Sequence, residues 1–288
     1  MTQTAQIITS YGRRYIIRTD DGQTFDATTR KKRVDYACGD RVRIELINAE
    51  QAVIEDYLPR QSLLYRQDAW KTKLIAANVS QLLIVTAAVP SPSEALLQRA
   101  LLAAEAAGIE AVIVLNKADL PETAAWRDKL KFYEGLGYRI IETRALENAE
   151  ALKPLLQGHT NILLGQSGMG KSTLTNALLG NQAARVGDIS TALDSGKHTT
   201  THAQLYDLNE HTQLIDSPGL QEFGLHHLEA AELLRYFPDL THLAGQCRFH
   251  NCTHRAEPGC AVKTAAEAGE VSAARVEFLQ RITDELLR

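Results

Sequence analysis

Residues 165–172 read Gly-Gln-Ser-Gly-Met-Gly-Lys-Ser, which fits the phosphate-binding pattern G-x-x-x-x-G-K-[ST]. Glycines let backbone N–H groups approach a phosphate chain, and the N-terminus of a following helix adds positive potential. Lys171 would reach the β- and γ-phosphates, and the Ser172 hydroxyl would bind Mg²⁺. A structural glycine-rich turn is the alternative. The pattern predicts a nucleotide site formed by Gly165, Gln166, Ser167, Gly168, Met169, Gly170, Lys171, Ser172 and Thr173.

A second motif, Asn116-Lys117-Ala118-Asp119, follows an expected strand over residues 111–115. The Asp119 carboxylate can accept hydrogen bonds from both N1–H and the 2-amino group of guanine. Adenine has an acceptor at N1 and no 2-amino group, so it would leave this carboxylate poorly paired. The motif therefore favours GTP over ATP. Alternatively, Asp119 only caps the helix that follows.

The order of the two motifs is unusual. Most small GTPases carry the guanine-reading motif after the phosphate loop, whereas here it comes first. A parallel sheet can be cut at one loop and rejoined at its old termini when those termini lie close together. We therefore predict a circularly permuted GTPase domain, in which the segments that sense the nucleotide come last.

Two later segments fit that sensing role. Residues 183–201 are polar and have no helical or strand period, as in a switch loop, with Thr201 as the first candidate for a Mg²⁺ ligand and Thr200 as the second. The segment 216–219 fits D-x-x-G, in which Asp216 would hold the water shell of the metal. The Gly219 N–H would then contact the γ-phosphate.

The catalytic group is harder to assign. Many GTPases follow the D-x-x-G glycine with a glutamine that orients the attacking water, but this chain has Leu220, which predicts slow intrinsic hydrolysis. His226 and His227 lie close downstream, and a histidine can orient or deprotonate water near neutral pH. A purely structural role for both is the alternative.

A cysteine-rich segment near the end suggests a metal site. The spacing C-x4-C-x-H-x5-C supplies three thiolates and one imidazole, a closed tetrahedral set that suits structural zinc. Scattered reduced thiols are the alternative, and His250 competes for the fourth ligand position. The candidate ligands are Cys247, Cys252, His254 and Cys260.

The elements that must position these groups fall into three units. Residues 1–66 alternate short strands (5–9, 15–19, 24–28, 41–47 and 52–57) with turns, which predicts a small β-barrel of the OB type. Such barrels often bind oligonucleotides. The basic run 30–33, with Tyr11, Tyr15 and Tyr36 available for stacking, would fit that use, although the run by itself is better explained as a solvated loop.

Residues 67–80 connect this barrel to a region where strands and helices alternate, which predicts a parallel sheet with ligands at the carboxyl ends of its strands. The expected strands are 82–88, 111–116, 138–143, 161–164 and 213–215, and the expected helices 93–107, 123–134 and 149–156. This GTPase domain spans 67–228. A helical zinc-binding domain, 229–288, ends in a helix from 272 to 287, which Ser272 can cap and whose apolar stripe packs in the core.

Composition limits the partners. A net charge of −4 over 288 residues excludes a surface coated in basic groups, so any nucleic-acid contact must be local. The N-terminus has no secretory pattern, and the longest apolar run, about residues 82–89, is too short to span a bilayer. We expect a soluble cytoplasmic protein without disulfides.

Together, the motif order and the cysteine pattern resemble those of the bacterial ribosome small subunit-dependent GTPase A family over essentially the whole chain. The resemblance rests on N-K-A-D (116–119), G-Q-S-G-M-G-K-S (165–172), H-T-T-T (198–201), D-S-P-G (216–219) and the cysteine motif ending E-P-G-C (257–260). It implies an OB-fold, a circularly permuted GTPase domain and a zinc-binding domain.

The resemblance also implies a function. It points to late maturation of the 30S subunit, contact with 16S rRNA, and slow GTP hydrolysis that the subunit stimulates. We also expect the protein to be a monomer that binds neither DNA nor membranes. It makes His254 the fourth zinc ligand and His227 the catalytic histidine, beside Lys171, Thr201 and Gly219. Residues 142–145 depart from the usual guanine-loop pattern S-A-K.

Two other functions fit parts of the sequence. One is an RNA-binding module or chaperone for which the nucleotide is a structural ligand. The other is an enzyme that acts on a different substrate and is powered by ATP. Competition between GTP and ATP, and turnover with and without 30S subunits, would separate the three.

Overall fold

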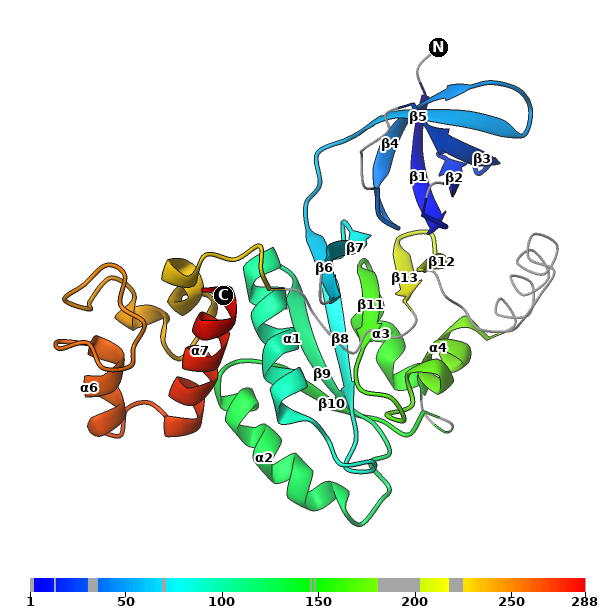
Figure 1. Cartoon of the computed structure of the whole chain (residues 1–288). Helices are drawn as coiled ribbons and strands as arrows, with labels where there is room; N and C mark the ends of the chain where they lie inside the picture. Colours follow the sequence, from blue (N-terminus) through cyan, green and yellow to red (C-terminus); the bar gives the residue numbers. More distant parts are fainter. Residues whose placement is uncertain are drawn as a thin grey trace.

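The computed structural model describes residues 3–12, 14–30, 36–68, 71–145, 147, 149–180, 203–217 and 225–287. An N-terminal barrel, a central α/β layer and a C-terminal helical region follow one another along the chain (Figure 1). Among the described residues, no helix has the length and apolarity needed to cross a bilayer.

The N-terminal strands form a closed barrel, as predicted. Strand order is β1-β2-β3-β5-β4, and β4 pairs back onto β1. Alternate residues point inward, so that Ile7, Ile17, Ile44 and Ile54 make its core. The strands are β1 (Gln3–Ser10), β2 (Arg14–Thr19), β3 (Thr24–Thr29), β4 (Arg41–Leu46) and β5 (Gln51–Tyr57).

Two tyrosines assigned to nucleic-acid stacking lie inside this barrel, so that part of the prediction is wrong. Tyr15 and Tyr36 are 3% and 5% exposed and pack edge to face, 5.7 Å between ring centroids. An aromatic ring removes more apolar area from water in the core than it would on the surface. Neither ring is available to a base.

The central part of the sheet has the order β10-β9-β8-β11-β13-β12, parallel except for the antiparallel strand β12. Both of its faces are covered, which explains why β8 is buried along its whole length. The strands are β8 (Gln81–Thr86), β9 (Glu110–Leu115), β10 (Arg139–Glu142), β11 (Thr160–Leu164), β12 (Gln204–Asn209) and β13 (Thr212–Asp216).

Helices cover the two faces of this sheet. One face packs against α1 (Glu94–Ala107) and α2 (Thr123–Gly135), and the other packs against the 3-10 turn η1 (Ala149–Leu152), α3 (Lys153–Leu156) and α4 (Lys171–Leu179). Ser93 caps α1 by accepting a hydrogen bond from the Leu96 N–H. This arrangement confirms the alternating pattern expected from residue 81 onward.

Two features were not expected. Residues in the predicted connector 67–80 form part of a hairpin, β6 (Leu63–Asp68) and β7 (Lys71–Ala77). Strand β12 was also missed, and it links the sheet to the barrel through the pair Thr9 and Gln204 on β1 and β12.

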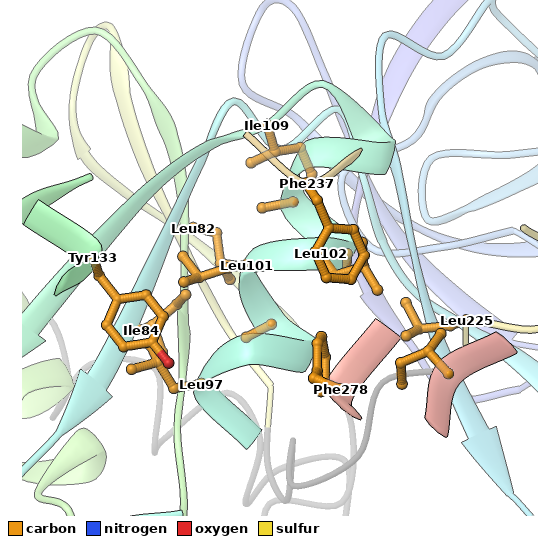
Figure 2. Close-up of a cluster of buried hydrophobic side chains, with 14 of the residues drawn as sticks. Leu82, Ile84, Leu97, Leu101, Leu102, Ile109, Tyr133, Leu225, Phe237 and Phe278 are labelled. Atoms are coloured by element: carbon orange, nitrogen blue, oxygen red, sulfur yellow. The ribbon is translucent and has the colours of Figure 1, made fainter. Parts of the chain in front are cut away.

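The C-terminal region consists of η2 (Ala230–Tyr236), η3 (Thr241–Leu243), α6 (Ala261–Glu267) and α7 (Ala273–Leu286). Its apolar residues belong to the same core as α1 and the sheet. Figure 2 shows Phe237 and Phe278 beside Leu102 of α1. Val276, Leu279 and Ile282 of the predicted stripe are buried as expected, and Leu286 is half-buried against the same core. Ser272 occupies the N-cap position, but its side chain makes no capping hydrogen bond, so the predicted side-chain cap is wrong.

Candidate nucleotide and metal sites

The phosphate loop lies between β11 and α4 and depends on two glycines. Gly165 has φ +151°, and a Cβ there would lie 2.0 Å from the Val85 carbonyl oxygen. Gly170 has φ +93°, and its Cβ would lie 2.2 Å from the Asn116 Nδ2 atom. Because neighbouring atoms already occupy the space that a Cβ would need, neither position admits a side chain. The two glycines therefore let the loop pack directly against Val85 and Asn116.

The guanine-reading segment contacts this loop directly. Asn116 Nδ2 donates to the Met169 carbonyl at 2.8 Å, and Asn116 Oδ1 accepts from the Ala145 N–H at 3.0 Å. Lys117 Nζ donates to the Gly168 carbonyl at 2.7 Å. The two motifs, separated in the sequence, thus meet at the carboxyl ends of β9 and β11.

A mostly polar hollow lies beside this junction. It has a volume of about 440 Å³ and is lined by Ala118, Glu142, Thr143, Arg144 and Glu147. The Ala118 N–H donates to the Thr143 carbonyl at 3.2 Å, which ties the two walls together. Asp119 is exposed next to Ala118, and no described residue donates a hydrogen bond to its carboxylate.

Lys171 and Asp216 form the charged part of the site. Lys171 Nζ donates to the carbonyls of Gly165 at 2.6 Å and Gln166 at 2.9 Å. Burial lowers the pKa of Lys171, and the charge of Asp216 partly offsets that effect. Burial likewise raises the pKa of Asp216, against the effect of Lys171. A phosphate chain would add negative charge next to Lys171, and Mg²⁺ would add positive charge next to Asp216.

The two histidines after the D-x-x-G segment point to different elements. The His227 ring stacks on Tyr65 of β6, with 4.2 Å between centroids. His226 Nε2 lies 3.6 Å from Glu285 on α7. Three predicted residues, Thr200, Thr201 and Gly219, lie outside the described residues.

The predicted metal ligands converge. The donor atoms of Cys247, Cys252, His254 and Cys260 all lie within 4.8 Å of one another. His254 presents Nδ1, which lies 3.7 Å from the Cys247 Sγ and 3.5 Å from the Cys260 Sγ. A tetrahedral site with ~2.3 Å Zn–S bonds has edges near 3.7 Å, so the set fits zinc. The rival ligand His250 is exposed and does not belong to the cluster.

Electrostatics also fit a metal there. Burial raises the pKa of the Cys252 thiol to about 12 and lowers the pKa of His254. A neutral imidazole is the form that binds metal, and a buried thiol ionises readily only when a cation compensates its charge.

Comparison with known proteins decides the family. Residues 57–226 match the family model described as RsgA GTPase. The chain belongs to the RsgA GTPase family. The small ribosomal subunit biogenesis GTPase RsgA of Neisseria meningitidis serogroup C is 82% identical over 286 residues, which cover 99% of this chain and 93% of that protein. The protein of the same name from Nitrosospira multiformis is 44% identical, and the match covers 98% of this chain and 90% of that protein.

Solved structures agree. YjeQ from Thermotoga maritima superposes with a TM-score of 0.73 at 29% identity and covers 100% of this chain and 99% of its own. YloQ, described as a circularly permuted GTPase, has a TM-score of 0.72 at 24% identity, covers 99% of this chain and 95% of its own, and shares the fold. The predicted permutation is confirmed. As an RsgA-family GTPase, this protein is a GTP hydrolase whose ligand is a guanine nucleotide.

Sequence reasoning missed the bridging role of Asn116. It treated the N-K-x-D segment as a base reader, whereas in the structure the buried Asn116 amide joins the phosphate loop to the loop around Ala145. The available signal was chemical, because an asparagine that directly follows a buried strand needs partners for its amide. Gln166 was likewise expected only at the phosphates, and its Oε1 also accepts from the Ser93 N–H at the start of α1.

Proposed function

We propose that this GTPase acts in biogenesis of the small ribosomal subunit and that the 30S subunit stimulates its hydrolysis of GTP. The names of its relatives state that role for those proteins, and their identity to this chain extends over nearly its whole length. The observation that carries the proposal is the direct bonding of Asn116 and Lys117 to the phosphate loop. This contact supports a single pocket for GTP.

Each group then has a role. The segment from Asn116 to Asp119 holds the base, and the phosphate loop from Gly165 to Thr173 holds the phosphates. Lys171 stabilises charge that develops on the γ-phosphate. Ser172 and Thr201 bind Mg²⁺, with Asp216 on its water shell, and the Gly219 N–H senses the γ-phosphate. His227 orients the attacking water, and because it stacks on Tyr65, its ring must reorient to do so.

The nucleotide state controls how the protein holds the subunit. GTP orders the segments around 183–201 and 216–224, and the barrel (1–66) and the zinc unit (229–288) then contact 16S rRNA. The protein acts as a monomer in the cytoplasm. Hydrolysis relaxes both segments and promotes release. This requires that the GTP-bound form bind the subunit more tightly than the GDP-bound form, since a ligand with equal affinity for both states shifts nothing.

The test is turnover with titrated 30S subunits. We expect the wild-type protein to be accelerated, Lys171→Ala to lose both basal and stimulated hydrolysis, and His227→Ala to lose mainly the stimulated part. If subunits failed to accelerate the wild type and Lys171→Ala changed nothing, an RNA-binding module with a structural nucleotide would be the better account. If ATP competed as well as GTP, an enzyme that acts on a different substrate and is powered by ATP would be the better account.

We also propose that the cysteine cluster holds one structural zinc ion. The wild type and the matched variant His250→Ala should each bind about one zinc per chain, as measured by mass spectrometry of the native protein. His254→Ala should lose the metal and destabilise the C-terminal unit, because that unit draws folding energy from metal binding. Full zinc retention in His254→Ala would refute the assignment.

A further inference from the structure

The loop between the first two metal ligands exposes an aromatic ring next to a cation. Phe249 is 40% exposed, although large apolar side chains are usually buried. The Arg248 guanidinium carbon lies 5.4 Å from the centroid of that ring. An exposed ring with an arginine beside it is a combination that proteins use to stack nucleic-acid bases.

The backbone holds this pair in place. The Arg248 N–H donates to the Gly259 carbonyl at 3.0 Å, and the Cys252 N–H donates to the Phe249 carbonyl at 3.2 Å. The Arg248 side chain also packs on Gly259, where a Cβ would approach it to 3.0 Å. Little conformational entropy would therefore be lost when a ligand binds.

The surrounding charges leave Arg248 able to contact an anion. Residues 240–256 contain no Asp or Glu. The nearest following carboxylate, Glu257, accepts hydrogen bonds from Thr253 and from the Arg255 N–H, and the Arg255 side chain pairs with Asp284. Within the described part of the chain, Arg248 forms no ion pair.

Three described arginines of the barrel are already paired. Arg14 pairs with Asp26, Arg41 with Asp20, and Arg30 with Glu45. Tyr15 and Tyr36 are buried. Each of these barrel arginines would have to give up a carboxylate partner before it could bind phosphate, which Arg248 need not do.

We propose that Phe249 and Arg248 form a stacking platform for an unpaired RNA base, with Phe249 against the face of the base and Arg248 on the adjacent phosphate. This deepens the proposed function, on which it rests, by naming the chemistry of one rRNA contact. RNA fits better than a protein partner because, among the described residues from 133 to 286, Phe249 is the only large apolar side chain that is exposed.

The test compares Phe249→Ala and Arg248→Ala with Phe132→Ala, a matched control that removes an equally exposed ring (40%) from α2. Binding is measured to 30S subunits by sedimentation with a non-hydrolysable GTP analogue, and to single-stranded and duplex RNA of equal length by fluorescence anisotropy. Zinc content confirms that each variant is folded.

We expect Phe249→Ala to weaken binding to subunits and to single-stranded RNA by about 5- to 100-fold, and Phe249→Tyr to restore it. Arg248→Ala should lower the slope of log affinity against log salt by about 1. Phe132→Ala should bind as the wild type does, and duplex RNA should not distinguish the variants.

The proposal would be overturned if Phe249→Ala bound 30S subunits and single-stranded RNA as tightly as Phe132→Ala does. An equal loss on duplex RNA would also overturn it, as would a loss confined to subunits with none on free single strands, which would indicate a ribosomal protein as the partner. If wild type bound single strands through Phe249 but did not bind subunits, the platform would stand and the proposed function would fail.

Discussion

At the scale of single residues, the site depends on the absence of side chains as much as on their presence. Gly170 and Asn116 illustrate this, because the amide that bridges to Met169 occupies the space that a Cβ on residue 170 would need. The chemistry of the phosphate loop is therefore linked to the guanine-reading segment through one steric contact.

Gly170→Ala should disturb the phosphate loop and the guanine-reading segment together. Its φ of +93° already disfavours alanine, and the added methyl group would displace the Asn116 amide. We expect a loss of about 2–4 kcal/mol in unfolding free energy and at least tenfold weaker GTP binding, by denaturant titration and calorimetry. Gly135→Ala, where a Cβ meets open space, is the control. Equal behaviour of the two variants would contradict the steric account.

At the scale of elements, the chain that leaves the D-x-x-G segment is anchored to the last helix. Leu225 is fully buried, and His226 lies beside Glu285 of α7, which also bonds to Arg99 of α1. The hydrogen bond from Arg99 lowers the pKa of Glu285, with smaller contributions from His226 and Arg281. Glu285 thus joins the GTPase layer to the C-terminal region.

This junction predicts a pH dependence. Because the pKa of Glu285 in the folded protein is below its ordinary value of 4.5, its ion pair stabilises the fold above about that pH and is lost as the pH falls through the lowered pKa. Glu285→Gln should melt at a lower temperature than the wild type at about pH 7, and the difference should shrink toward pH 4. A constant difference across that range would show that the charge is unimportant.

Most elements could be predicted from patterning, and the exceptions have physical reasons. The β6–β7 hairpin was missed because its connecting residues, Ala69-Trp70, include none of the usual turn formers. Strand β12 has only one buried residue, Leu205, so its alternation is weak. Tyr15 was misassigned because a sequence cannot tell which face of a strand a barrel closes around. Tyr36 lies outside the strands, in a segment whose burial no alternation indicates.

At the scale of the molecule, the outer regions attach differently. The barrel has its own core and meets the sheet mainly through polar pairs, with Gln6 bonded to Gln213, Thr9 to Gln204 and Arg18 to Asp207. Only Ile8 and Cys38 of the described barrel residues 3–57 pack against the shared apolar core. The C-terminal region shares one apolar core with α1 and the sheet. The barrel seam lies on β12 and β13, between the two candidate switch segments. The boundaries 1–66, 67–228 and 229–288 stay a prediction.

This difference predicts two unfolding units. Phe278→Ala removes a ring that is 3% exposed in the shared core and should cost about 3–5 kcal/mol, lowering the melting of the GTPase layer and the C-terminal region together. Ile17→Ala should act on the barrel alone. Hydrogen exchange measured by mass spectrometry would distinguish the two unfolding units. Faster exchange confined to residues 229–287 in Phe278→Ala would contradict a shared core.

The central claim is that a carboxylate encoded early and a phosphate loop encoded late form one guanine-nucleotide pocket. Its most direct test is the affinity of Asp119→Asn for GTP and for xanthosine triphosphate. An amide in place of the carboxylate cannot accept from both N1–H and the 2-amino group of guanine, but it can accept from N1–H and donate to the 2-oxo group of xanthine. We predict at least ~100-fold weaker binding of GTP and a gain for the xanthine nucleotide. Unchanged affinity for GTP would contradict the account.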